Sequence, residues 1–226
     1  MKKVGFIVFA AALLIGLVFA NGCGFGGINN NFGGVRGSGT AKSEPRNLSG
    51  FNKVEAGGAL NVEVTAQKDF SVVIEADDNL LQYIKTEVRG DTLKIYTDGK
   101  ISMQKKASVK ISMPEITGLD VSGASTAVVT NVKADALELE ASGASRITID
   151  GEVKDLIADS SGASGIDAEQ LKVENADVEA SGASSATVSA ANELKADASG
   201  ASSIYYAGEP KNVVPKSSGA SSVKKK

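Results

Sequence analysis

The second half of the chain alternates apolar and polar residues around a recurring word. Leu137–Ala141, Ala176–Ala180 and Leu194–Ala198 each alternate with a period of two, which is typical of a half-buried β-strand. Ser-Gly-Ala-Ser follows such segments six times, 18 to 20 residues apart. Its copies begin at Ser122, Ser142, Ser161, Ser181, Ser199 and Ser218. A constant interval of this length indicates a solenoid, and the segments between copies are too short for a helix with its connections. We therefore expect a β-solenoid.

Aligning the repeats on this word places apolar residues at equivalent positions of successive coils. Three positions are almost uniformly apolar: one and three residues before the word, and five residues after its first Ser. They hold Val121, Ala141, Ser160, Ala180, Ala198 and Ser217; Leu119, Leu139, Ala158, Val178, Ala196 and Pro215; and Ala127, Ile147, Ile166, Ala186, Ile204 and Val223. We expect these side chains to point inward, with coils stacked about 4.8 Å apart. The Gly of the word is expected to turn a corner through backbone angles closed to other residues. The Ser residues are expected to bond local backbone or to stack as a ladder.

The first half is less regular. Five segments alternate like strands: 51–55, 60–64, 71–75, 92–96 and 108–112. Residues 76–84 are expected to hold a short helical turn, and Ala56–Ala59 to be a degenerate first copy of the corner. We expect residues 46–115 to be an irregular cap that continues the solenoid, with residues 116–226 as its repeat coils. Phe51, Phe70, Tyr83 and Tyr96 are expected to form the core of this cap.

The N-terminus is typical of an export signal. Lys2 and Lys3 precede an uncharged run, Val4–Ala20, so residues 1–22 are interpreted as a signal peptide. Cys23 follows directly and resembles the cysteine of a bacterial lipobox, although Ala20 stands where that motif usually has Leu. The alternatives are an uncleaved anchor helix, or an ordinary signal peptide with an incidental cysteine.

A lipobox at this place implies a lipid-anchored protein. Cys23 would become the first residue and carry two or three acyl chains, which anchor a protein stably in a membrane. Gly24 in place of Asp favours the outer membrane by the usual sorting pattern. Residues 23–45 are rich in Gly and Asn and are expected to form a flexible tether.

The composition excludes several classes of site. The 226 residues include 24 Lys and Arg against 27 Asp and Glu, and they contain no His, no Trp and one Cys. Without His there is no Ser-His-Asp triad and no imidazole metal ligand, and one Cys permits neither an internal disulfide nor a cysteine metal cluster. A formal net charge of −3 argues against nucleic acid as a partner.

One position of the repeat is acidic in five successive coils. Two residues before each word stand Asp120, Glu140, Asp159, Glu179 and Asp197, and then Lys216. Stacking would place these carboxylates in one outward column. The column is either a solvated acidic face or a weak Ca²⁺ site, because Ca²⁺ takes carboxylate oxygens. An exposed column offers no desolvation to raise a pKa for glycosidase chemistry, so we expect no enzyme activity and no other cofactor.

Several segments together resemble one known family, the head GIN domain. They are Phe51–Val54, Ala59–Val64, Val73–Leu81, Thr92–Ile95 and the repeated words that begin after Leu119–Val121. That family is described as an auto-transporter adhesin head and is common in secreted and lipid-anchored envelope proteins of Bacteroidetes. The resemblance implies an all-β fold, a right-handed parallel β-helix, and it brings no catalytic or ligand residues.

These observations together predict a non-catalytic lipoprotein of the outer membrane. It would be held to the membrane through Cys23 and would bind a surface polysaccharide or a protein on its solenoid. The alternatives are a polysaccharide-acting β-helix enzyme and a structural envelope protein that associates with itself.

Overall fold

The computed structural model describes residues 34–103 and 105–226, and residues 34–226 form one compact unit. Cys23 and the predicted signal peptide lie outside the described residues. Among the described residues, no helix is both long and apolar enough to cross a membrane.

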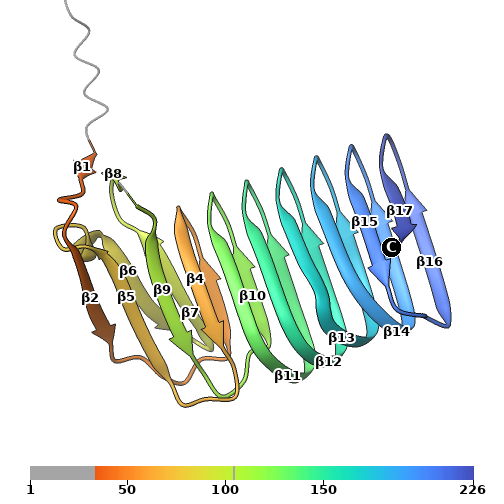
Figure 1. The fold of residues 1–226 in the computed structure, drawn as a ribbon, viewed down its shortest axis with the longest axis horizontal. Helices are drawn as coiled ribbons and strands as arrows, with labels where there is room; N and C mark the ends of the chain where they lie inside the picture. Colours follow the sequence, from red (N-terminus) through yellow and green to blue (C-terminus); the bar gives the residue numbers. More distant parts are fainter. Residues whose placement is uncertain (1–33, 104) are drawn as a thin grey trace, which may run out of the picture. The chain divides into compact units, whose positions relative to one another are not determined.

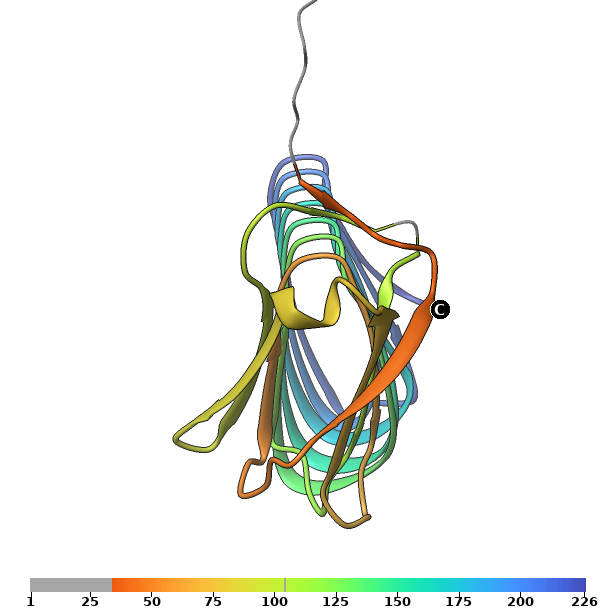
Figure 2. The same ribbon diagram turned by 90° about the vertical axis from the view of Figure 1, so that its left-hand side faces the viewer.

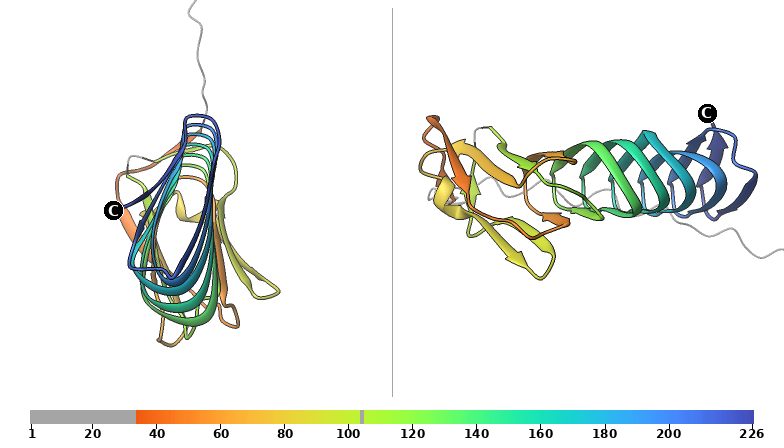
Figure 3. Two further views of the ribbon diagram at one scale, coloured as in Figure 1. Left: turned by 90° about the vertical axis from the view of Figure 1, so that its right-hand side faces the viewer. Right: turned by 90° about the horizontal axis from the view of Figure 1, so that it is seen from below.

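The C-terminal half is a parallel β-solenoid of about five turns, which confirms the predicted fold class (Figure 1). Seen from below, its coils follow one another along a single axis (Figure 3). The strands are β10 (Gly118–Val121), β11 (Thr126–Ala141), β12 (Arg146–Ser160), β13 (Gly165–Ala180), β14 (Ser185–Ala198), β15 (Ser203–Ala207), β16 (Asn212–Ser217) and β17 (Ser222–Lys225). Each of β11 to β13 spans most of one coil, and the β11–β12 register shifts between Val129 and Val132. Each long strand bends partway along, so its N-terminal part belongs to the sheet on one side of the solenoid and its C-terminal part to the sheet on the other (Figure 2).

The repeated word forms the corner between the two sheets. The six glycines of the word have φ angles of 74° to 78°, in the left-handed region. A Cβ atom on Gly162 would lie 2.8 Å from the carbonyl oxygen of Gly143 in the preceding coil. That same carbonyl accepts a hydrogen bond from the backbone N–H of Ala163, at 2.7 Å. Glycine is therefore required both by the turn and by the close approach of successive coils.

The second Ser of the word is structural. Ser125, Ser145, Ser164, Ser184 and Ser202 are all buried. The hydroxyl of Ser164 donates to the carbonyl of Ala141 in the preceding coil at 2.8 Å, and Ser145 donates to Val121 in the same way. The buried hydroxyls thus tie each corner to the strand beneath it.

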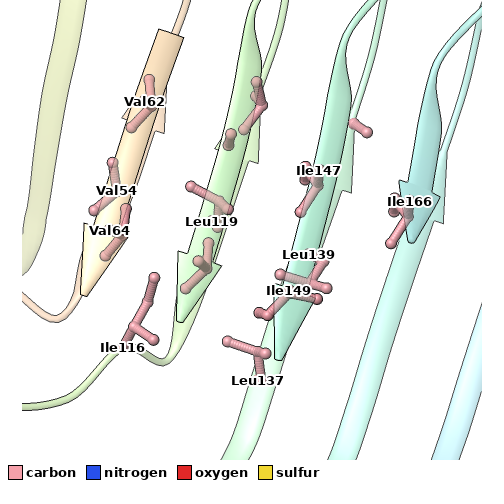
Figure 4. Packing of buried hydrophobic residues seen from close by; sticks show 14 of the residues in the cluster. Val54, Val62, Val64, Ile116, Leu119, Leu137, Leu139, Ile147, Ile149 and Ile166 are labelled. Atoms are coloured by element: carbon pink, nitrogen blue, oxygen red, sulfur yellow. The ribbon is translucent and has the colours of Figure 1, made fainter. Parts of the chain in front are cut away.

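The core runs along the inside of the solenoid. Side chains of equivalent positions, such as Leu119 and Leu139, stack from coil to coil (Figure 4). The three inward columns predicted from the repeat are buried from Leu119 to Ile204. The last coil differs, because Pro215 and Ser217 are exposed and Val223 is only half-buried.

The first half continues the same stack and then closes it. Parallel pairing extends through β3 (Lys53–Ala56), β4 (Leu60–Thr65), β7 (Thr92–Thr97) and β9 (Ala107–Ser112). Three strands are antiparallel: β2 (Ala41–Arg46), β5 (Ser71–Asp77) and β6 (Ile84–Arg89). The short 3₁₀ turn η1 (Leu81–Tyr83) lies across the N-terminal end of the solenoid (Figure 2). Leu80, Leu81 and Ile84 are buried there, so the turn covers the end of the core.

The degenerate first corner is confirmed at Gly57 and Gly58. Gly58 has a φ angle of 108°, and its carbonyl accepts the N–H of Ala124 at 2.7 Å, as the later corners accept theirs. The N–H of Leu60 donates to the hydroxyl of Ser125. Residues 56–59 are therefore the first of the stacked corners, although they contain no Ser.

Two expectations for the first half were wrong, and one strand was not predicted. Part of the segment 23–45 predicted as a flexible tether is paired, because β1 (Val35–Arg36) pairs with β8 (Ile101–Ser102) and β2 pairs with β5. These strands are held by backbone pairing and their residues are largely exposed, so their sequences show no alternation of apolar and polar residues that would predict a strand. Among the predicted cap aromatics, Phe51 is buried, but Phe70 and Tyr96 are 36% and 40% exposed. The strand β6 follows η1 directly, in a segment for which no strand was predicted.

Candidate functional site

The structure brings the five predicted carboxylates into one column on the outward face of one sheet. Asp120 pairs in register with Glu140, and the same pairing continues through the following coils. We call Asp120, Glu140, Asp159, Glu179 and Asp197 the acidic column. Each member belongs to a strand just before its corner, where the period of two directs the side chain away from the core.

The column extends further than the repeat indicated. Glu55 of β3 pairs in register with Asp120, and Lys94 of β7 pairs with Glu55. Lys94 and Glu55 also form an ion pair. At the other end Lys216 pairs in register with Asp197. A lysine therefore flanks the row of carboxylates at each end.

Glu55 could have been found from the sequence. When Gly57-Gly58 is aligned with Ser122-Gly123, Glu55 falls two residues before the corner, as Asp120 does. Lys94 gave no such signal, because no corner word follows β7 and only the pairing of β3 with β7 places it in the column.

Two shallow depressions lie along the acidic column. One, of about 200 Å³, is lined by four of its carboxylates together with the first serines of three words. Those residues are Glu140, Asp159, Glu179 and Asp197, with Ser161, Ser181 and Ser199. The other, of about 180 Å³, surrounds Asp120 and is lined by Lys53, Glu55, Glu138 and Glu140 among others. Carboxylates and hydroxyls thus face solvent along several coils.

Asp120 is half-buried, whereas the other four members of the column are exposed. Burial raises the pKa of Asp120 to about 6, with further contributions from Glu140 and Glu55 that Lys94 partly opposes. Burial also raises the pKa of Asp159, assisted by Glu179 and Glu140. The expectation that the column offers no desolvation was therefore wrong for these two carboxyl groups.

The carboxylates are aligned rather than convergent. Within residues 34–103 and 105–226 there is no group of three or more His, Cys, Asp or Glu arranged to hold a metal ion. Parallel strands hold equivalent side chains side by side at about 4.8 Å, all pointing the same way. Ca²⁺ takes six to eight oxygens, so one or two neighbouring carboxylates would bind it weakly and leave most ligands to water. The Ca²⁺ site stays a prediction.

The outward face of the other sheet is chemically different. Its central positions hold Val128, Thr148, Asp167, Thr187 and Tyr205, which pair in register. Over residues 118–198 as a whole, fifteen Asp and Glu stand against five Lys and Arg. The sheet of the acidic column consists of residues 118–121, 136–141, 155–160, 175–180 and 193–198, and it holds nine of these Asp and Glu with one Lys.

Comparison with known proteins gives one family and several similar structures. The family model described as "Putative auto-transporter adhesin, head GIN domain" matches residues 50–210. A crystal structure of a putative adhesin from Bacteroides fragilis is 22% identical, with a TM-score of 0.72 over 85% of this chain and 100% of that one. No curated protein matches the chain.

Two structures from Parabacteroides are also similar. A putative adhesin from Parabacteroides merdae is 18% identical, with a TM-score of 0.57 over 84% of this chain and 98% of that one. A putative lipid binding protein from Parabacteroides distasonis is 20% identical, with a TM-score of 0.52 over the same shares. At these identities the likeness shows the fold alone, which these proteins share with the described unit.

Proposed function

Because the chain belongs to the head GIN domain family, we propose that it is a non-catalytic envelope protein that presents its solenoid as a binding surface. A lipid on Cys23 would hold it at the outer membrane. The single observation that supports binding is the acidic column, a row of carboxylates at a fixed spacing along a stack of parallel coils. A surface of this kind suits an extended partner, either a protein or a polysaccharide.

The acidic column is the proposed contact surface. Its spacing of about 4.8 Å along the axis is set by backbone hydrogen bonding and not by flexible side chains. Cationic groups of a partner would meet several carboxylates at once, and Ca²⁺ would bind weakly between neighbours such as Asp159 and Glu179. The serine hydroxyls that line the same depression would add neutral hydrogen bonds.

Calorimetric titration of Ca²⁺ tests this surface directly. We expect a Kd of about 10⁻³ M, as in weak extracellular sites, and loss of the heat in Asp159→Asn/Glu179→Gln. The matched control is Glu152→Gln, which removes a carboxylate that is paired with Lys172 outside the column. An absence of heat at millimolar Ca²⁺, or equal heat in the column variant, would contradict the proposal.

A glycan array read together with a reducing-sugar assay tests the wider function. A binding protein retains a glycan and releases no reducing ends, whereas a depolymerising enzyme releases them. Retention that weakens in Asp159→Asn/Glu179→Gln would assign binding to the acidic column.

The proposed lipid anchor has its own test. In cells fed radiolabelled palmitate, the wild-type chain is expected to take up label and to fractionate with the outer membrane. Cys23→Ser is expected to lose the label. Equal labelling of the variant would reject Cys23 as the acylated residue.

A polysaccharide-acting enzyme is the second candidate, and Asp120 is the observation that favours it. Its pKa of about 6 would let it donate a proton near neutral pH, and Glu140 lies one coil away as a second carboxylate. Glycosidases use two carboxyl groups that flank the scissile bond, so a substrate would have to lie between these two aligned side chains. Reducing ends released by the wild type and not by Asp120→Asn would establish this candidate in place of the first.

A further inference from the structure

A small lobe beside the first described residues combines cationic and apolar side chains. Strand β1 pairs in parallel with β8 apart from the main sheet (Figure 1). The N–H of Val35 donates to the carbonyl of Lys100 at 2.9 Å, and the N–H of Gly37 donates to the carbonyl of Ser102 at 3.0 Å. We call the following residues the anchor-side lobe: Val35, Arg36, Lys100, Ile101, Ser102, Met103, Lys105 and Lys106.

The cationic side chains of this lobe are available to a partner. Arg36, Lys100, Lys105 and Lys106 are all exposed. In the part of the chain that the structure describes, none of the four forms an ion pair. Lys106 instead donates to the backbone carbonyl of Ala124. Three acidic residues lie near the lobe: Asp98 of the connecting loop, Asp77 beside Gly37, and Asp78, which accepts from the hydroxyl of Ser38. Four positive charges therefore stand against three negative charges, and the three lysines lie on the segment 100–106, which contains no acidic residue.

Apolar side chains lie among these charges. Val35 is 38% exposed and Ile101 is half-buried, whereas Met103 packs against the hydrophobic core. Exposed aliphatic groups beside Lys and Arg are typical of surfaces that rest in a membrane interface, where the apolar part meets acyl chains and the cations meet headgroups.

The lobe is also close to the proposed anchor along the chain. Ten residues separate Cys23 from Gly34, and ten residues span at most about 35 Å when fully extended. Val35 and Arg36 come next and are paired with β8, so a lipid on Cys23 keeps the lobe within that distance of the bilayer.

We propose that the anchor-side lobe rests on anionic lipid headgroups of the leaflet that holds the lipid on Cys23. This inference rests on the proposed lipid anchor. A basic residue close to an anionic membrane strengthens binding about fivefold, and the effect is lost beyond about 10 Å at moderate salt. The same surface repels the acidic column, so the contact would direct the column away from the bilayer.

The chain offers a clean way to test this contact. It has one Cys and no Trp, so Cys23 can be coupled to a maleimide lipid and Val35→Trp becomes the sole indole reporter. The chain from residue 23 to 226 contains the whole described unit with its core. Chemical coupling makes the measurement independent of acylation in the cell, so failure of the lipid-anchor proposal and failure of this one are distinguishable.

The reporter is read in vesicles of 30% phosphatidylglycerol and 70% phosphatidylcholine, and in vesicles of phosphatidylcholine alone. We expect a blue-shifted emission that resists acrylamide quenching only with the anionic vesicles, and reversal of that shift in 0.5 M NaCl. Lys100→Glu/Lys105→Glu/Lys106→Glu is expected to lower the fraction of molecules in contact at least tenfold.

Two controls complete the design. Lys224→Glu/Lys225→Glu/Lys226→Glu reverses as many charges at the C-terminal end and is expected to leave the emission unchanged. Tyr205→Trp, in place of the Val35 substitution, puts the reporter on an exposed site of β15 and is expected to give the same emission in both vesicles. The proposal would be overturned if the blue shift of the Val35→Trp chain did not depend on anionic lipid. It would also be overturned if the shift were unchanged in Lys100→Glu/Lys105→Glu/Lys106→Glu.

Discussion

The corner glycines can be tested with one matched pair of substitutions. Gly162 has a φ angle of 75°, and a Cβ there would lie 2.8 Å from the carbonyl oxygen of Gly143. Gly50 has a φ angle of 80°, and a Cβ there would meet no atom within 4 Å. Gly162→Ala and Gly50→Ala therefore impose the same backbone strain, and only the first forces two coils apart.

The two substitutions should lower the free energy of unfolding by different amounts, because only Gly162→Ala disturbs a contact between coils. An alanine in the left-handed region costs about 1–2 kcal/mol, and we expect this loss for Gly50→Ala. At Gly162 the carbonyl that blocks the Cβ also accepts the N–H of Ala163, so it cannot move away without weakening that hydrogen bond. Overpacking of this kind costs a further 1–3 kcal/mol or so. We therefore expect Gly162→Ala to lose about 3–4 kcal/mol.

Urea unfolding followed by far-ultraviolet circular dichroism measures both variants. Both substitutions reduce the freedom of the unfolded chain equally, so this effect cancels in the difference between them. The difference should be about 2 kcal/mol. Equal losses in the two variants would refute the argument, because they would show that the corner needs glycine for its backbone angle alone.

Two further predictions concern the column and the buried serines. The pKa of Asp120 is raised to about 6, so the folded chain retains a proton between pH 4 and 6 that the unfolded chain releases, and stability should rise as pH falls from 7 to 5. Asp120→Asn should be more stable than wild type at pH 7 by about 1 kcal/mol, a figure reduced because the carboxyl group is only half-buried and solvent screens its charge. Its melting temperature should also depend less on pH. A variant less stable than wild type at pH 7 would contradict this prediction. Ser164→Ala removes the donor to the carbonyl of Ala141 and should cost about 1–2 kcal/mol in urea unfolding, whereas Ser161→Ala, at the exposed Ser of the same word, should cost under about 0.5 kcal/mol. Equal losses at the two serines would count against a structural role for the buried one.

The site was predictable where the repeat was regular. Asp120, Glu140, Asp159, Glu179 and Asp197 hold one position of a repeat, and stacking of equivalent positions is enough to align them. Partial burial of Asp120 was not predictable, because it depends on neighbouring coils and on Glu55 and Lys94 from the cap. A pKa reports the surroundings of a group in three dimensions, and those of Asp120 come from three other strands, β3, β7 and β11.

The sequence by itself determined the coil. The interval between the words, the alternation of apolar residues and the glycine at each corner are local properties, and they require a parallel stack because each coil repeats the contacts of the last. Only the tertiary structure decided how the stack begins. β2 pairs antiparallel with β5, β5 pairs antiparallel with β9, η1 lies across the end, and β1 pairs with β8. The sequence predicted a strand at 71–75 and a turn within 76–84, but it did not predict the partners of these elements, because backbone hydrogen bonds between segments distant in the sequence leave no pattern in the side chains.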